Sequence, residues 1–105
     1  MRSRVDANQP TLVKYIRDKG ATFFHTHELK GGGLDGVVGL WGVDQRVEFK
    51  DPKQPPSKRR LTEAEAETFK TWGGRKPVIL ETFTDVDVML EAMRKDARTL
   101  AKERY

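Results

Sequence analysis

The amino-acid sequence predicts a single α/β domain over residues 1–105, in which helices pack on a mixed β-sheet. Apolar residues recur at helical spacing near both ends of the chain, whereas the middle alternates polar and apolar residues as half-buried strands do. Stretches rich in glycine and proline separate these segments. The expected order is therefore α-β-β-β-α-β, followed by a C-terminal helix.

The first half of the chain is expected to form one helix and three strands. Asp6 or Asn8 can cap the helix, Pro10 is tolerated in its first turn, and Gly20 ends it. Its apolar face consists of Leu12, Val13 and Ile16. Strands are expected at residues 21–27, 34–41 and 45–50, with turns at 31–33 and 42–44. The last two strands are close enough in sequence to pair as an antiparallel hairpin.

The second half begins with a loop at residues 51–60, which contains three prolines and four basic residues. Thr62 and Glu65 then have the spacing of a capping box, for a helix that continues to about Trp72. A strand is expected at residues 77–83, with a buried centre at 78–80, and it joins the sheet through a crossover. Thr84 is expected to cap the last helix, whose apolar stripe is Val86, Met89, Leu90, Met93, Ala97 and Leu100.

Composition narrows the class of protein. With 20 Lys and Arg against 16 Asp and Glu, the net charge is +4, which favours polyanionic partners weakly. Cysteine is absent, which excludes disulfides, thiolate metal sites and cysteine catalysis. No apolar run is long enough to span a bilayer and no secretory signal is recognisable, so we expect an intracellular, cytoplasmic protein with no membrane partner.

Three residues form a candidate catalytic constellation. Asp35 is expected at the start of the second strand, and Glu48 and Lys50 lie two apart at the end of the third, so their side chains leave one face. Hairpin pairing would bring Asp35 beside Glu48. Two adjacent carboxylates, with the backbone carbonyl of Phe49, suit Mg²⁺ or Mn²⁺. Such an ion could activate water for phosphodiester hydrolysis, with Lys50 stabilising the transition state.

These residues resemble the PD-(D/E)XK nuclease signature, and the surrounding sequence is similar to the VRR-NUC family, which includes small phage-encoded nucleases. The matching stretches are residues 6–9, 31–36, 47–50 and 61–65, and the resemblance as a whole covers about residues 5–92 in the family's α-β-β-β-α-β order. Leu34 stands where the family carries proline. The resemblance implies a restriction-endonuclease-like sandwich, with Asp35 and Glu48 as metal ligands and Lys50 as the catalytic lysine. It also makes Gln9 a further candidate near the metal.

The function expected from this resemblance is a Mg²⁺-dependent DNA endonuclease, selective for branched DNA such as four-way junctions. Because a junction has two-fold symmetry and the chain is small, a homodimer is expected. The alternatives are a non-catalytic DNA-binding module on a nuclease-like fold, and an unrelated structural or protein-binding domain. The loop residues proposed to contact DNA phosphates are Lys53, Lys58, Arg59 and Arg60.

Other residues have ordinary explanations beside functional ones. Asp35 could simply end a turn, and Glu48 and Lys50 could form the polar face of an edge strand. His25 and His27 share one strand face, which favours polar or packing roles over catalysis without a third ligand. Glu65 is explained by the capping box, so its part in catalysis stays open. Core or dimer packing is favoured over base stacking for Trp41 and Trp72.

Overall fold

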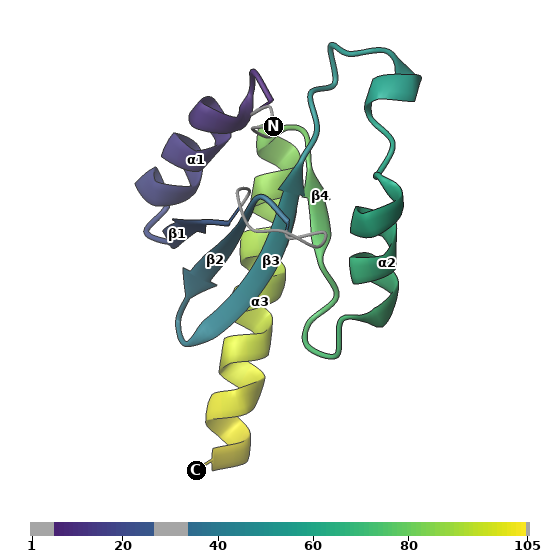
Figure 1. Cartoon of the computed structure of the whole chain (residues 1–105). Coiled ribbons are helices and arrows are strands. Elements are labelled where there is room, and N and C mark those ends of the chain that lie inside the picture. Colours follow the sequence, from purple (N-terminus) through teal and green to yellow (C-terminus); the bar gives the residue numbers. More distant parts are fainter. Residues whose placement is uncertain (1–5, 27–33, 105) are drawn as a thin grey trace.

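The computed structural model describes residues 6–26 and 34–104, which form an α/β fold around a mixed, four-stranded sheet. The predicted order of elements is confirmed (Figure 1). A short 3₁₀ helix, η1 (Pro56–Lys58), interrupts the predicted loop. The principal elements are α1 (Gln9–Asp18), β1 (Thr22–His25), β2 (Gly36–Leu40), β3 (Val43–Phe49), α2 (Glu63–Thr71), β4 (Val78–Leu80) and α3 (Phe83–Arg104).

The sheet has the order β1-β2-β3-β4. β2 pairs antiparallel with both β1 and β3, so the predicted hairpin is confirmed. β4 pairs parallel with β3, as expected for a strand that returns through a helical crossover. In this register Gly36 lies opposite Val47, and Phe49 lies opposite Leu80. The ends of β2 and β3 that carry Asp35 and Lys50 therefore meet at one end of the sheet.

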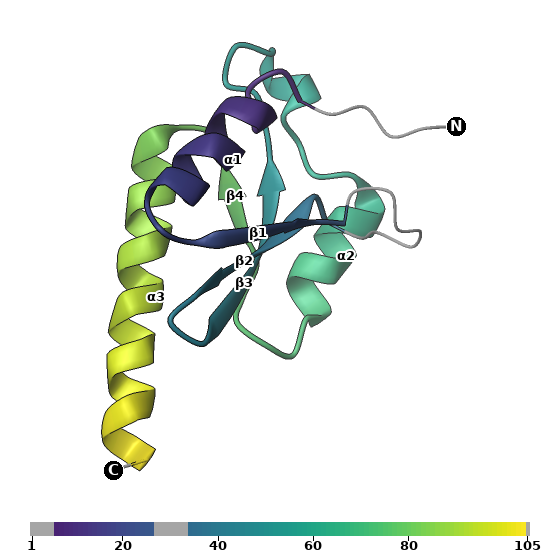
Figure 2. The ribbon, with the colours of Figure 1, turned by 90° about the vertical axis from the view of Figure 1, so that its left-hand side faces the viewer.

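Helices cover both faces of the sheet. α1 and α3 lie on one face and α2 lies on the other (Figure 2). The alternation along β3 sends Val43, Val47 and Phe49 toward α1 and α3, where they are buried. The hydrophobic core is made by α1, the residue before β1, the four strands and α3: Leu12, Val13, Ile16, Ala21, Phe23, Val38, Leu40, Val43, Val47, Phe49, Leu80, Val86, Met89, Leu90 and Met93.

The turn between β2 and β3 lies at Trp41 and Gly42, so its predicted position at 42–44 was wrong. The φ angles are 53° at Trp41 and 82° at Gly42, and two consecutive residues with positive φ make the tight turn that matches the twist of a hairpin. Trp41 adopts this conformation although few residues other than glycine do. Val43 consequently belongs to β3 and to the core.

The start of α3 also differs from the prediction. Thr82, rather than Thr84, caps the helix: its Oγ1 accepts a hydrogen bond from the Asp85 N–H at 3.2 Å, and Asp85 Oδ2 accepts one from the Thr82 N–H at 3.1 Å. β4 therefore ends at Leu80. Ile79 was expected to be buried but is 37% exposed, because it points to the face that α2 covers incompletely.

His27 and the glycines at 31–33 lie outside the described residues. Within residues 6–26 and 34–104, no helix has the length and apolarity needed to cross a membrane.

Candidate functional site

The structure brings Asp35, Glu48 and Lys50 together at the end of the β2–β3 hairpin. The backbone N–H of Asp35 donates to Glu48 Oε1 at 3.2 Å, and Asp35 Oδ2 accepts a hydrogen bond from the Phe49 N–H at 2.8 Å. All three side chains belong to buried residues. The predicted neighbourhood of Asp35 and Glu48 is therefore present in the fold.

Gly36, the residue after Asp35, lies where β1 and β2 approach each other closely. A Cβ atom at Gly36 would lie 2.2 Å from the ring of Phe23 and 2.7 Å from the carbonyl oxygen of Phe24. Such distances exclude a side chain without movement of β1. The glycine next to Asp35 thus allows β1 and β2 to pack closely directly beside the site.

Lys50 lies between two carboxylates. Its Nζ is 3.1 Å from Glu65 Oε1 and 3.4 Å from Glu48 Oε2. Glu65 comes from the first turn of α2, where the predicted capping box with Thr62 is confirmed. The same Glu65 Oε1 accepts a hydrogen bond from the Thr62 N–H at 2.8 Å. Glu65 therefore both caps α2 and joins α2 to the site, a contact that the local sequence pattern could not reveal.

The pKa values of Glu48 and Glu65 are shifted in opposite directions. Burial raises the pKa of Glu48 to about 9, and a hydrogen bond to Glu65 and the charge of Asp35 add to the effect. Burial also disfavours charge on Glu65, but its hydrogen bonds with Glu48, Thr62 and Lys50 outweigh this and lower its pKa. Without a bound cation the proton therefore resides on Glu48, and the ion pair of Lys50 is made with Glu65.

For Lys50, burial alone would lower the pKa, but its hydrogen bonds to Glu65 and Glu48 and the charge of Glu65 reverse the direction and raise it. Lys50 is thus a positively charged donor. A lysine in this state can neutralise charge on a phosphate, although it must first exchange its contact with Glu65 for one with the phosphate.

The start of α1 lies next to the site, where Asn8 bonds to the backbone of Lys50. Asn8 occupies the N-cap position but does not cap the helix, contrary to the prediction. Its Nδ2 instead donates to the carbonyl oxygens of Lys50 and Glu81, both at 3.0 Å. Asp6 lies close enough that burial and the charge of Asp35 raise its pKa. The first turn of α1 is consequently fixed to the end of β3.

Gln9 follows Asn8 and is 2% exposed. Its Oε1 is buried and has no hydrogen-bond partner among the residues that the structure describes. An unsatisfied buried oxygen costs free energy, so its presence calls for a partner beyond the described residues, such as a ligand or water.

The donor set at this end of the sheet fits a hard divalent cation. Asp35 and Glu48 supply carboxylate oxygens, and Gln9 supplies an amide oxygen without a partner. The Phe49 carbonyl leaves the same strand edge as the N–H that binds Asp35. Across residues 6–26 and 34–104, no three His, Asp or Glu side chains are grouped closely enough to hold a metal by themselves. Mg²⁺ does not require such a group, since it binds through one or two carboxylates and retains water.

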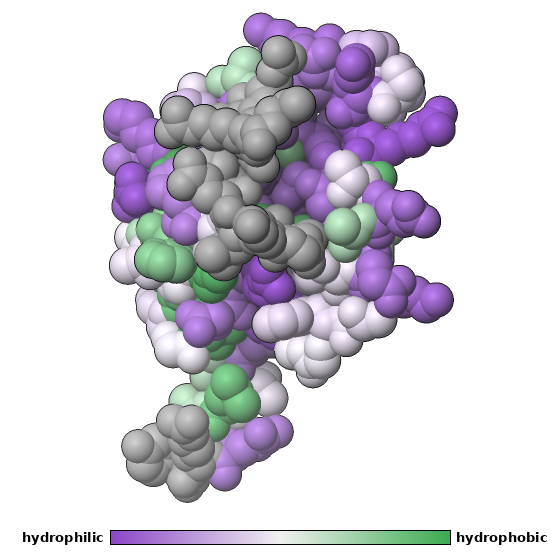
Figure 3. Space-filling view, viewed as in Figure 1, coloured by the Kyte–Doolittle hydropathy of each residue, from purple (hydrophilic) through white to green (hydrophobic). Residues whose placement is uncertain are grey.

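The basic loop follows directly after Lys50. Lys53, Lys58 and Arg60 are exposed, whereas Arg59 is half-buried and its Nη1 lies 3.4 Å from Glu81 Oε2. Hydrophilic side chains gather over η1 and α2 in the space-filling view (Figure 3). Three of the four predicted phosphate contacts are thus available to a ligand, and Arg59 is engaged within the protein.

His25, Trp41 and Trp72 are all exposed. His25 ends β1 and is exposed on the side of the sheet that faces α1. Trp41 is 60% exposed and Trp72 is 46% exposed, so neither belongs to the core. Each ring instead lies against an arginine. The Arg46 Cζ is 4.4 Å from the centroid of the Trp72 ring, and the Arg94 Cζ is 5.7 Å from the centroid of the Trp41 ring.

Comparisons of the chain with protein-family models, with curated proteins and with solved structures find no match in any of the three. The likeness to PD-(D/E)XK nucleases accordingly rests on the residues themselves and stays a prediction.

Proposed function

We propose that this protein is a Mg²⁺-dependent DNA nuclease that hydrolyses phosphodiester bonds. The observation that supports the proposal is the meeting of Asp35, Glu48 and Lys50 at the end of the β2–β3 hairpin. Asp35 lies 13 residues before Glu48 in the sequence, and a fold that used these side chains only as surface polar groups would not need to bury all three.

Each residue has a chemical task in this proposal. Asp35 and Glu48 would hold the cation, with Gln9 Oε1 and the Phe49 carbonyl as further ligands. When bound, Mg²⁺ would supply Lewis acidity and lower the pKa of water. Glu48 would release its proton to solvent to become a ligand. Lys50 turns from Glu65 toward the phosphate and stabilises the charge that develops on its oxygens.

DNA as the substrate is supported by charge. Exposed Lys53, Lys58 and Arg60 follow the site in the chain, and contacts of lysine or arginine with phosphates position a duplex without reading its sequence. Selectivity for branched DNA, a homodimer and an intracellular location belong to the same proposal. Light scattering tests the dimer, which a monomeric mass in solution would contradict.

Cleavage by the purified protein tests the activity. Labelled four-way junction, flap, single-stranded and duplex DNA are incubated with Mg²⁺, with Mn²⁺ or with chelator. Glu48→Ala and Lys50→Ala are expected to reduce cleavage by about a hundredfold or more, because each removes a group that acts on the transition state. Glu63→Ala and Lys70→Ala are matched controls, since both residues are exposed on α2.

The outcomes separate the alternatives. Metal-dependent cleavage that is lost in both site variants and kept in both controls supports the nuclease. Salt-sensitive DNA binding without cleavage would instead favour a non-catalytic binding module. Absence of both would leave an unrelated structural or protein-binding domain.

A further inference from the structure

A cavity of about 430 Å³ lies between α1 and the edge strand β1, beside the proposed metal ligands. Its lining includes Gln9, Val13, Lys14, Arg17, Asp18 and His25. None of the activities proposed above uses Arg17 or His25. The cavity is nevertheless joined to the site, because Gln9 belongs to both and its neighbour Asn8 bonds to the Lys50 carbonyl.

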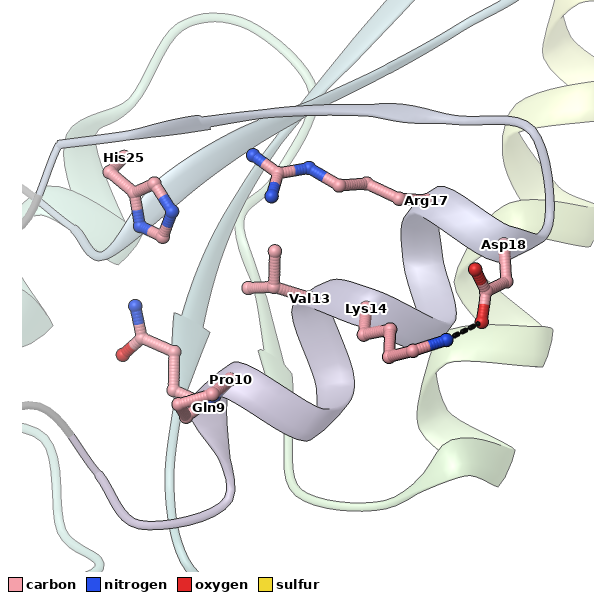
Figure 4. Close-up of a pocket in the computed structure, with 7 residues that line it drawn as sticks. All are labelled: Gln9, Pro10, Val13, Lys14, Arg17, Asp18 and His25. Atoms are coloured by element: carbon pink, nitrogen blue, oxygen red, sulfur yellow. Dashed lines mark hydrogen bonds and ion pairs between the residues drawn. The ribbon is translucent and has the colours of Figure 1, made fainter.

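The polar groups of the cavity converge at one end. Figure 4 shows the amide of Gln9, the guanidinium of Arg17 and the ring of His25 around one space above Val13. Lys14 and Asp18 lie at the other end and bind each other, with Lys14 Nζ 2.7 Å from Asp18 Oδ2. The negative charge of Asp18 is thus balanced by Lys14. Arg17 therefore gives a positive charge to the end of the cavity where Gln9 and His25 lie.

Arg17 is held in place for a ligand on this side. Its Nη2 donates to the carbonyl oxygen of Phe23 in β1 at 3.4 Å. A guanidinium carries five N–H donors in a planar fork, and this contact occupies one of them. The backbone of β1 therefore positions the fork, whose geometry matches the oxygens of a phosphate.

Gln9 gives the second, independent observation. The side chain is buried, and its Oε1 has no partner among the described residues. Figure 4 shows its nitrogen turned toward His25. Because an amide offers an acceptor on one side and two donors on the other, Gln9 can face a cation through Oε1 and an anion through Nε2.

We propose that this cavity is a phosphate subsite, in which Arg17, His25 and Gln9 Nε2 bind a phosphate of the nucleic-acid strand next to the one that is cleaved. The proposal rests on the proposed function for the identity of the ligand. Its phosphate is either an internal diester or the monoester at a strand end, since both present the same oxygens to these donors.

Binding measured without cleavage tests the subsite. Fluorescence anisotropy of the full chain is recorded in chelator with two labelled single strands, one carrying a 5′-phosphate and the other a 5′-hydroxyl. Arg17→Gln is expected to weaken binding about tenfold and to reduce the salt dependence of the logarithm of affinity by about 0.7, the value for one lost phosphate contact. Arg17→Lys should restore part of the affinity, because it keeps the charge and loses the fork.

Arg98→Gln is the matched control, because Arg98 is also an exposed helical arginine and belongs to the C-terminal half of α3. His25→Gln is a second test, because it removes the imidazole from the cavity. Arg17 is exposed, so circular dichroism should show its variants folded.

The two sources of phosphate give different results. If the wild-type protein prefers the 5′-phosphorylated strand and Arg17→Gln removes that preference, the subsite holds a terminal phosphate. Equal weakening for both strands assigns an internal one. Loss no greater than that of Arg98→Gln, or no binding by the wild type, would overturn the subsite.

A cleavage assay on the same proteins keeps this proposal distinct from the nuclease. Cleavage that is insensitive to Arg17 would refute the subsite and leave the nuclease standing. Binding that depends on Arg17 without any cleavage would support the subsite and contradict the nuclease.

Discussion

The two helices that flank the sheet are attached to it by different means. α3 buries Val86, Met89, Leu90 and Met93 against the strands. None of the nine residues of α2, all of them described by the structure, is buried. α2 instead contacts β3 and its end, through the ion pair of Glu65 with Lys50 and the stacking of Trp72 on Arg46.

This difference divides the tasks of the two faces. Burial of apolar area contributes about 25 cal/mol per Å² and dominates folding. The Glu65–Lys50 ion pair is largely buried, with side chains 16% and 10% exposed, so the cost of desolvating both charges offsets much of their attraction. The α3 face therefore provides stability, and the α2 face carries Glu48, Lys50 and Glu65 with little apolar support. Substitutions on the first face should change unfolding, and those on the second should change chemistry.

The largest effect is expected for Met93→Ala, in the middle of the α3 face. Met93 is fully buried, and truncation of such a side chain costs about 2–5 kcal/mol through lost burial and the cavity that remains. Urea unfolding followed by circular dichroism measures this loss. Cleavage per folded molecule should stay close to wild type, because Met93 lies on the opposite face from Lys50.

Leu100→Ala is the control for Met93→Ala. Leu100 belongs to the same stripe but is 46% exposed on the C-terminal part of α3 that extends past the sheet (Figure 1). It should cost less than about 1 kcal/mol. A loss as large as that of Met93→Ala would show that a second copy of the chain covers this end of α3. The α3 face would then serve assembly as well as folding.

The next effect is a pH dependence on the α2 face. Glu48 has a folded-state pKa near 9 against an ordinary 4.5, so folding takes up a proton between these values and the free energy of unfolding falls as pH rises through them. If Mg²⁺ binds through Glu48 as proposed, binding should release that proton to solvent. Affinity for Mg²⁺ should therefore rise up to about tenfold per pH unit around neutrality, measured by calorimetry in buffers of different ionisation enthalpy.

Glu65→Gln sharpens this second prediction. Glutamine keeps the capping interaction with Thr62 but removes the charge that helps to raise the pKa of Glu48. The proton release should then shift to lower pH, whereas Glu63→Gln, on the exposed side of the same turn, should leave it in place. An affinity for Mg²⁺ that does not vary with pH would contradict Glu48 as a protonated ligand.

Much of the fold could be predicted because its signals are local. Alternation along residues 43–50 places Val47 and Phe49 on one face and Glu48 and Lys50 on the other, and the capping box of Thr62 and Glu65 marks the start of α2. These features depend on neighbours within a few residues. The facing of Asp35 and Glu48 followed from hairpin pairing in the same way.

What could not be predicted depends on contacts between distant segments. Asn8 has the identity of a helix cap, but its amide binds Lys50 and Glu81, which are 42 and 73 residues away. Thr82 and Thr84 are equally plausible caps until the end of β4 is known. Likewise, Arg17 and His25 carry no joint motif, and only the packing of α1 on β1 brings them to one cavity.

The smallest effect is expected for Trp72→Ala, at the end of α2 remote from Glu65. The Arg46 guanidinium lies 4.4 Å from the Trp72 ring, and such contacts are worth about 0.5–1 kcal/mol at exposed sites. Its loss should speed hydrogen exchange of the α2 amides about two- to fivefold while global unfolding hardly changes. Trp41→Ala removes a similar contact with Arg94 of α3 and should leave exchange in α2 as it is. Equal exchange in α2 for both variants would mean that the contact of Trp72 with Arg46 does not help to hold this helix, and would move the comparison to the ion pair of Glu65 with Lys50.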